Sequence, residues 1–259
     1  MGKTRAKWNE GIYRKRLKEG RGQGELSSYK PWLTIHDIAS KGYAVRVYGQ
    51  KTQRIHHLLS HYELYYFYLL EWSDQVLDIR EQFPMRLSET VQIAAGAGIK
   101  HPWDNRSGFP YVMTTDFLIT TEKGLMARTV KSTEELADRR VREKFEIERR
   151  YWAGCGIEWK IITEKQIDVV KAKNIIWLSS GDRVQSCIPD ERQRMECERA
   201  FLQMYEDPDI PFSRILEMAD GNSGTGSGAG LSLFKELVRK GRIRLDLSRP
   251  VCFTDPRGQ

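Results

Sequence analysis

The stretch YVMTTDFLIT, residues 111–120, decides the fold that this sequence predicts. Together with GLMARTVK, residues 124–131, it is typical of two strands joined by a glycine turn, because aromatic and β-branched residues favour a pleated ribbon. Asp116 lies in the middle of the first strand, where a buried carboxylate is unfavourable unless a partner neutralises it. Alternation along the strand places Asp116 on one face with Thr114 and Leu118. The predicted hairpin therefore contains an acid that needs an explanation.

The second strand ends in Thr129-Val130-Lys131, which offers that explanation. Thr129 and Lys131 share one face of the strand and Val130 points to the other, so a paired hairpin brings Lys131 towards Asp116. An acid followed by x-Val-Lys on the next strand is the skeleton of the metal-dependent nuclease site written PD-(D/E)xK. In such a site carboxylates hold Mg²⁺ against a phosphodiester, a lysine orients or deprotonates the attacking water, and the Val130 carbonyl can add a ligand. The alternative is a salt bridge across the hairpin.

Two further acids strengthen the nuclease interpretation. Glu63 lies in the apolar segment 56–72, which is predicted to form a buried helix. Glu148 lies on the inward-facing stripe of a helix expected to start at Ser132 and to end at Gly154 or Gly156. An acid on a buried stripe needs a partner, and a metal ion would serve. Either acid could instead be paired structurally, Glu148 as a capped or salt-bridged interface residue.

The predicted elements follow the order helix, strand, strand, strand, helix, strand. That α-β-β-β-α-β order is the core of restriction-endonuclease-like α/β folds, and we place this domain at residues 1–165. The remaining predictions are a basic arm or short helix over residues 1–24, a loop over 88–110, a strand over 157–163, a helix opened by Thr163 and ending near Leu178, polar helices over 182–220 and a flexible Gly/Ser-rich segment over 220–230.

Positive charge is concentrated at the start of the chain. Residues 1–54 hold 13 Lys or Arg against 4 Asp or Glu, a local charge of +9, and the whole chain carries +7, so the remainder sums to −2. Such a local basic excess favours a polyanion as partner, although a solvated tail that aids solubility is the alternative. No apolar run is long enough to span a bilayer, and the four cysteines form no CxxC pair, which suits a reducing compartment.

Several motifs carry a more specific resemblance. They are RLKEGRGQG, YKPWLT, HHLLSHYELYYFYLLEW, VLDIREQFP, GIKHP, TTDFLIT, VK and EKFEIERRYW. In this order and spacing, over about residues 14–180, the chain resembles the TnsA endonuclease subunits of heteromeric cut-and-paste transposases. The resemblance implies a bacterial cytoplasmic enzyme, associated with the nucleoid during transposition, that uses Mg²⁺, with Mn²⁺ able to substitute. It would nick the 5′ strands of transposon ends, beside a TnsB-type subunit that cuts and joins the 3′ ends and a TnsC-type AAA+ regulator.

The resemblance also implies a ligand set, and one residue departs from it. It assigns catalysis to Glu63, Asp116 and Lys131, and metal binding to Glu63, Asp116, Val130, Thr129 and Glu148. The family has Gln or an acid where this chain has Thr129, and a hydroxyl is a poorer, neutral ligand. The site therefore relies on its other ligands, depends on a partner to complete it, or is inactive. We expect an active but conditional site, and the alternative is an inactive DNA-bound adaptor that keeps the fold for docking.

For residues 166–259 the resemblance implies a small winged-helix-like domain that binds DNA or the TnsC-type regulator. A helix over 234–240 would lead into a wing strand over 241–247. The predicted DNA contacts are Lys235, Arg239, Lys240, Arg242 and Arg244 here, and Arg14, Lys15, Arg16, Lys18 and Arg21 in the N-terminal arm. The alternatives are a unit that docks only protein, or a free-standing transcription regulator, which would leave the buried acids unexplained.

Overall fold

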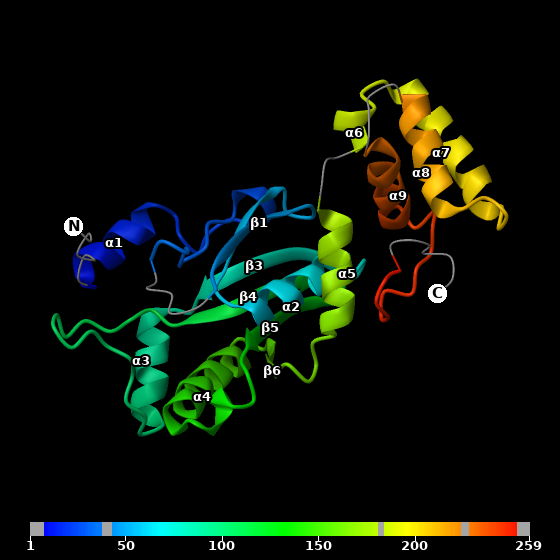
Figure 1. Ribbon diagram of the computed structural model, residues 1–259. Coiled ribbons are helices and arrows are strands. Elements are labelled where there is room, and N and C mark those ends of the chain that lie inside the picture. Colours follow the sequence, from blue (N-terminus) through cyan, green and yellow to red (C-terminus); the bar gives the residue numbers. More distant parts are fainter. Residues whose placement is uncertain (1–7, 38–42, 181–183, 224–227, 253–259) are drawn as a thin grey trace, which may run out of the picture. The chain divides into compact units, whose positions relative to one another are not determined.

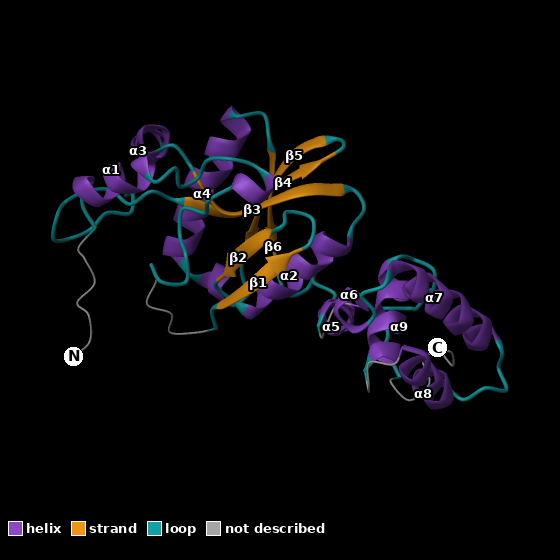
Figure 2. Ribbon diagram, turned by 90° about the horizontal axis from the view of Figure 1, so that it is seen from above, coloured by secondary structure: helices purple, strands orange, loops and turns teal. Residues whose placement is uncertain are grey.

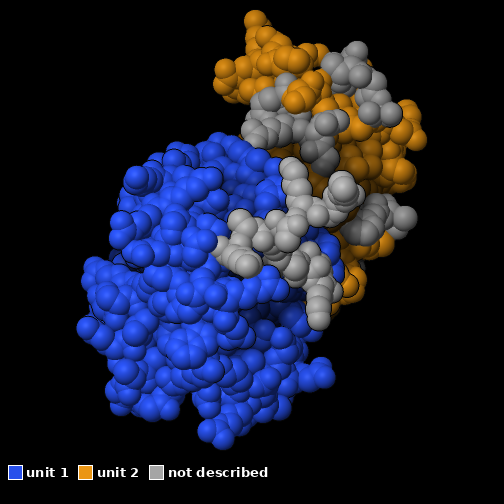
Figure 3. Space-filling view, turned by 90° about the vertical axis from the view of Figure 1, so that its left-hand side faces the viewer, with its two compact units in different colours: residues 1–167 blue, residues 168–259 orange. Residues whose placement is uncertain are grey.

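A computed structural model describes residues 8–37, 43–180, 184–223 and 228–252 of the chain. The chain divides into two compact units, residues 1–167 and 168–259, which Figure 3 shows in blue and orange. All described strands belong to the first unit, whereas the described part of the second consists of helices and loops (Figure 2). None of the described helices has both the length and the apolar character that crossing a bilayer requires.

The first unit is built around a four-stranded mixed sheet. Its strands are β3 (Val76–Pro84), β4 (Thr114–Thr121), β5 (Gly124–Val130) and β6 (Glu158–Ile162), in that spatial order (Figure 1). The first three run antiparallel and β6 pairs with β5 in parallel. The predicted hairpin is confirmed, with Phe117 opposite Arg128, although its first strand starts at Thr114 and not at Tyr111.

Helices pack around this sheet in the predicted order, with one addition. The helices are α1 (Glu10–Lys18), α2 (His61–Trp72), α3 (Leu87–Gly96) and α4 (Arg139–Gly154), and a separate two-stranded ribbon consists of β1 (Val45–Gly49) and β2 (Arg54–Leu58). The order α2-β3-β4-β5-α4-β6 matches the prediction, whereas the loop predicted over residues 88–110 is wrong because α3 occupies its first part. Of the glycines that suggested a loop, Gly96 ends α3 and the others follow it, and α3 packs beside α4 (Figure 1).

Three predicted helix starts are also corrected. The helix predicted over residues 56–72 begins at His61, because Ser60 caps it and the preceding residues belong to β2. The Ser132 capping pattern opens only the 3₁₀ turn Glu135–Ala137, and Asp138 caps α4. The Thr163 pattern forms a turn, and α5 begins at Val169. In each case the local capping chemistry forms, but a later residue starts the regular helix.

Side-chain alternation reverses at Gln82 of β3. Glu81 contacts Arg54 of β2, whereas Phe83, two residues later, packs against Trp152 of α4. Residues two apart on a regular strand share a face, so the strand changes face between them. Gln82 is 2% exposed and has a left-handed backbone with φ of 48°, which is uncommon for a non-glycine residue. This irregular position is opposite Asp116, the third residue of β4.

The second unit consists of helices and loops in its described part. Its helices are α5 (Val169–Ser179), α6 (Val184–Cys187), α7 (Glu191–Glu206), α8 (Phe212–Ser223) and α9 (Ala229–Arg239). They surround an aromatic core that includes Phe201, Phe212 and Phe234. The wing strand predicted over residues 241–247 is wrong, because turns and bends occupy it. The predicted flexible segment 220–230 is corrected at both ends by α8 and α9, and residues 224–227 lie outside the described residues.

Candidate active site

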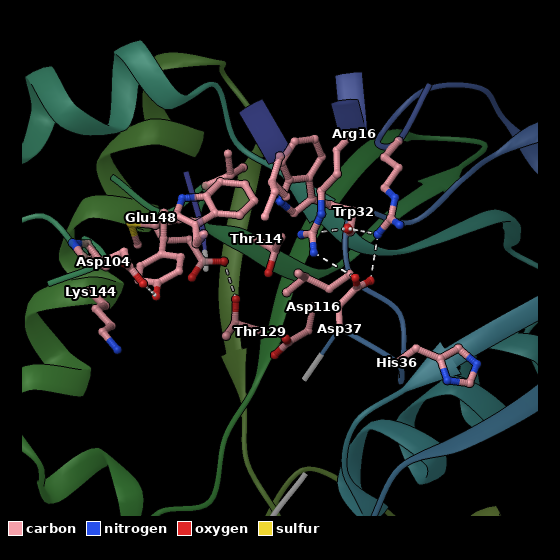
Figure 4. A pocket seen from close by; sticks show the side chains of 18 of the residues that line it. Arg16, Trp32, His36, Asp37, Asp104, Thr114, Asp116, Thr129, Lys144 and Glu148 are labelled. Atoms are coloured by element: carbon pink, nitrogen blue, oxygen red, sulfur yellow. Dashed lines mark hydrogen bonds and ion pairs between the residues drawn. The ribbon is translucent and has the colours of Figure 1, made fainter. Parts of the chain in front are cut away.

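One pocket of the first unit brings together the residues that the sequence predicted for a nuclease site. It has a volume of about 960 Å³ and is lined from α1, α2, β4, β5 and α4 (Figure 4). The predicted residues in its lining are Glu63, Asp116, Thr129, Val130, Lys131 and Glu148. Because they come from different elements, only the tertiary fold can gather them.

Asp116 lies where β4 and β5 separate. The ladder between the two strands ends at the pair of Phe117 and Arg128. Beyond it, the backbone N–H of Val130 donates to Asp116 Oδ2 at 2.8 Å, and Gln82 Nε2 donates to Asp116 Oδ1 at 3.3 Å. The carboxylate therefore takes the place of a strand partner, which explains how an acid is accommodated in the middle of a strand.

Glu63 enters the pocket from the first turn of α2. Ser60 caps the helix by accepting from the Glu63 N–H at 3.1 Å, and its hydroxyl donates to Glu63 Oε1 at 3.0 Å. The Leu59 N–H donates to Oε2 at 3.0 Å. This arrangement is a variant of the capping box, in which the third helical residue reaches back to the preceding turn. Glu63 is only 6% exposed, and these donors from its own turn fix the position of its buried carboxylate.

Glu63 and Asp116 are both buried, and the charge of Asp116 disfavours ionisation of Glu63. Burial raises the pKa of both Glu63 and Asp116, and the charge of Asp116 raises the pKa of Glu63 further. The charge of Lys131 acts in the opposite direction on both groups. Two buried carboxylates that cannot easily ionise together form a centre that favours an added positive charge.

Glu148 reaches the pocket from α4 and is also buried. Its Oε1 accepts hydrogen bonds from the hydroxyls of Thr115 at 2.7 Å and Thr129 at 2.5 Å. Burial raises the pKa of Glu148 to about 7, with a smaller contribution from the charge of Asp116, while the two hydroxyl donors oppose the rise. Three acids with raised pKa values therefore line one pocket, which is typical of functional sites.

Lys131 follows the last residue of β5. Its N–H donates to the Ile162 carbonyl at 2.9 Å, which ties this end of β5 to β6. Its ammonium pairs with Glu135 Oε1 at 2.6 Å and its side chain is 30% exposed. The expected convergence of Lys131 and Asp116 on one pocket is present, but the salt bridge of Lys131 is to Glu135 and not across the hairpin.

The donor types of this centre suit a hard divalent cation. Carboxylate and carbonyl oxygens are the ligands that Mg²⁺ prefers. Among the described residues, no three His, Cys, Asp or Glu side chains already stand close enough to hold an ion. The repulsion between Glu63 and Asp116 is nevertheless what a cation would relieve. The residues therefore fit Mg²⁺ by donor chemistry and by charge.

The N-terminal cations form one wall of the same pocket. Of the predicted arm, residues 10–18 form α1 and residues 1–7 lie outside the described residues, and Trp8 buries its ring against Trp32 to hold α1 in place. Arg16 and Arg21 both pair with Asp37, at 2.8 and 2.7 Å (Figure 4). Of the five predicted DNA contacts, these two are therefore committed to structural ion pairs, whereas the exposed ones are Arg14, Lys15 and Lys18.

The predicted cations of the second unit also divide into two kinds. Lys235 is 8% exposed and donates to the Ser180 carbonyl at 2.9 Å, so its prediction as a phosphate contact is wrong. Arg239 pairs with Glu236, and Lys240 pairs with Glu198 on α7. The remaining two, Arg242 and Arg244, are exposed.

The sequence analysis missed several residues of the site. Gln82 and Thr115 touch Asp116 and Glu148, and no periodicity marks a lone Gln or Thr on a strand as functional. Lys144 lines the pocket one turn before Glu148 on α4. Burial lowers the pKa of Lys144, and nearby Arg140 and Lys131 lower it further. Its spacing of four residues from Glu148 was a signal that could have found it.

Comparisons with known proteins agree with the site. A family model described as TnsA-like endonuclease N terminal matches residues 73–164, and one described as TnsA endonuclease C terminal matches residues 166–247. The chain is 48% identical over 183 residues to the transposon Tn7 transposition protein TnsA of Escherichia coli. That alignment covers 70% of this chain and 66% of the relative, so the chain spans just under two thirds of the relative's length. The first model includes Asp116, Lys131 and Glu148 but begins after Glu63.

Proposed function

This chain belongs to the TnsA endonuclease family, and on that premise we propose that it is the subunit of a transposase that hydrolyses the 5′ strand at transposon ends. The observation that carries the proposal is the single pocket in which Glu63, Asp116 and Lys131 meet from three different elements. The α2-β3-β4-β5-α4-β6 order supports a restriction-endonuclease-like fold for the first unit.

We assign a divalent cation, Mg²⁺ with Mn²⁺ as a substitute, to Glu63, Asp116 and Glu148, with the Val130 carbonyl as a further contact. When bound, it would lower the pKa of an attacking water and offset the charge of the phosphodiester. Thr129 is left out of this ligand set, because its hydroxyl oxygen accepts from Trp159 Nε1 while its proton goes to Glu148.

The chain's own groups perform the remaining steps. Lys131, which lines the pocket and pairs with Glu135, would orient the attacking water as an ammonium, or take its proton as the neutral amine. The exposed cations of α1, Lys15 among them, would hold the DNA backbone along one wall. In the second unit Arg242 and Arg244 are available for further phosphate contacts. We propose TnsB-type and TnsC-type subunits as partners, on bacterial transposon DNA.

The inactive-adaptor alternative is not favoured. Its motivation was Thr129 and the basic arm, and the hydrogen bond from Thr129 to Glu148 supports a role for Thr129 beside that acid. The acids that an adaptor would not need are all present in the pocket.

The test is a cleavage assay with the TnsB-type and TnsC-type partners, transposon-end DNA and Mg²⁺. Asp116→Asn and Glu63→Gln should abolish 5′-strand cutting, and Lys131→Ala should slow it by roughly 10²–10⁴-fold. Glu146→Gln is the matched control, since Glu146 lies on α4 and pairs only with the half-exposed Arg149 and Arg150. Equal cutting by Asp116→Asn and the parent protein would exclude the assignment.

A further inference from the structure

Glu148 is held by a chain of four hydrogen bonds that begins and ends at tryptophan. Trp152 Nε1 donates to Thr115 Oγ1 at 2.6 Å, and Thr115 Oγ1 donates to Glu148 Oε1 at 2.7 Å. On the other side, Trp159 Nε1 donates to Thr129 Oγ1 at 3.0 Å, and Thr129 Oγ1 donates to the same oxygen at 2.5 Å. Figure 4 shows the link between Thr129 and Glu148.

When Glu148 is ionised, the direction of every bond in this chain is determined. An indole N–H can only donate, and an ionised carboxylate can only accept. Each threonine hydroxyl has a single proton, so a hydroxyl that accepts from tryptophan gives its proton to Glu148. The two tryptophans therefore fix both hydroxyls in the orientation that supports the carboxylate, and neither hydroxyl has to reorient.

Burial makes this chain energetically significant. Glu148, Thr115 and Trp152 are each at most 2% exposed, and Thr129 is 5% exposed. Burying an ionised carboxylate without hydrogen-bond donors is strongly unfavourable, so Glu148 needs both hydroxyls at these positions. Both hold Oε1, whereas Glu148 itself lines the pocket, so Oε2 is the oxygen left for a ligand.

We propose that Thr115 and Thr129 are positioning residues that present Glu148 to the divalent cation, so that Glu148 replaces the ligand missing two residues before Lys131. The inference rests on the proposed function. It explains why a neutral hydroxyl occupies that place: Thr129 acts through an acid from α4 and not on the ion itself. Thr115 acts in the same way from β4, although it is not part of the pocket lining.

The experiment measures Mn²⁺ binding to the full chain by calorimetry and by the free-Mn²⁺ resonance signal. Thr115→Val removes the hydroxyl and nearly keeps the shape, and should weaken Mn²⁺ binding by roughly 10-fold, as other outer-shell substitutions do. Thr115→Ser should bind within about 2-fold of the parent protein, since it keeps the hydroxyl. Thr90→Val is the matched control, a buried threonine on α3 whose hydroxyl donates to the Leu87 carbonyl.

A double-mutant cycle separates positioning from direct ligation. In a Glu148→Gln background, Thr115→Val and Thr129→Val should each change Mn²⁺ binding by less than about 2-fold, because their effect passes through Glu148. A loss of the full 10-fold in that background would overturn the proposal, and so would parent-like binding by folded Thr115→Val. If Thr115→Val does not fold, the Thr129→Val and Thr129→Ser pair decides by the same criteria.

The outcomes also distinguish this inference from the proposed function. Mn²⁺ binding that Asp116→Asn abolishes but Glu148→Gln leaves unchanged would overturn the positioning role alone. Absence of Mn²⁺ binding by the parent protein, with or without transposon-end DNA, would overturn both.

Discussion

At the scale of single residues, Gln82 connects the irregular strand to the acid centre. Its amide donates to Asp116 and its carbonyl oxygen accepts from Thr114 Oγ1 at 3.1 Å, while its backbone carbonyl accepts from the Trp32 N–H at 3.2 Å. A left-handed non-glycine residue persists only where its surroundings compensate for the strain, and such positions gather at functional sites. Here Gln82 orients Asp116 through its amide. Its backbone carbonyl also holds Trp32, against which the residues around α1 pack.

We predict that Gln82→Met lowers the free energy of unfolding by about 1–2 kcal/mol, because it removes the amide that pairs with Asp116 and Thr114. The same substitution at Gln53, which has a φ of 53° but is exposed, should change stability by less than about 0.5 kcal/mol. Urea unfolding monitored by circular dichroism measures both. Equal losses would mean that the backbone conformation alone, and not the buried amide, is responsible.

Glu81, the neighbour of Gln82, carries the clearest stabilising charge. Burial alone would raise its pKa, but His56 and Arg54 lower the pKa to about 2 from an ordinary 4.5. A lowered acid pKa gives stability that is present above about pH 4.5 and is lost as the pH falls towards 2. Glu81→Gln should therefore destabilise the protein by about 3 kcal/mol at pH 7 and by much less near pH 2. Unfolding free energies across this range provide the measurement, and a penalty independent of pH would contradict the ion pair.

At the scale of elements, α1 combines two functions on different faces. Arg16, with a side chain 12% exposed, pairs with Asp37 and stacks over Trp8 and Trp32. Lys15, with a side chain 76% exposed, projects from the same helix. One face of α1 therefore fixes the helix to the unit, and the other presents positive charge.

We predict that Lys15→Gln combined with Lys18→Gln weakens non-specific DNA binding and reduces the slope of log affinity against log salt by about 2, because two phosphate contacts are lost. The melting temperature should change little. Arg16→Gln, by contrast, should lower the melting temperature and leave the salt slope little changed, since it breaks the contact with Asp37. Salt titrations and thermal melts of the full chain test both, and an unchanged slope in the double lysine variant would remove α1 from DNA binding.

At the scale of the whole molecule, the buried acid centre opposes folding. The pKa values of Glu63, Asp116 and Glu148 are all raised, mainly by burial. A group whose acid pKa is raised binds more protons when folded, so this contribution to stability falls as the pH rises from the ordinary pKa, 3.8 for Asp116 and 4.5 for the two glutamates, through the folded pKa. The destabilisation is therefore greatest at neutral and mildly basic pH.

We predict that Mg²⁺ raises the melting temperature of the protein more at pH 8 than at pH 5.5, because the cation must compete with protons at the lower pH. Asp116→Asn should remove most of this difference. Thermal melts with and without Mg²⁺ at the two pH values measure it. A larger effect at pH 5.5, or equal effects in Asp116→Asn and the parent protein, would contradict a cation at this centre.

The sequence by itself determined what depends on local patterns. Alternating β-branched residues around a glycine turn specified the β4–β5 hairpin, and the spacing of Asp116 and Lys131 along it placed both at one end. Helical periodicity identified Glu63 and Glu148 as inward-facing acids. These features can be predicted from the sequence because each is set by neighbours within a few residues along the chain.

Only the tertiary structure decided how these residues cooperate. Four contacts depend on partners far away along the chain. Thr129 donates to Glu148, Gln82 donates to Asp116, the buried Lys235 donates to Ser180, and Arg16 pairs with Asp37. A hydroxyl, an amide or a charge has no periodicity that reveals its partner. Its role is fixed when burial removes water and leaves only the groups packed around it within hydrogen-bonding distance, and that happens only in the folded chain.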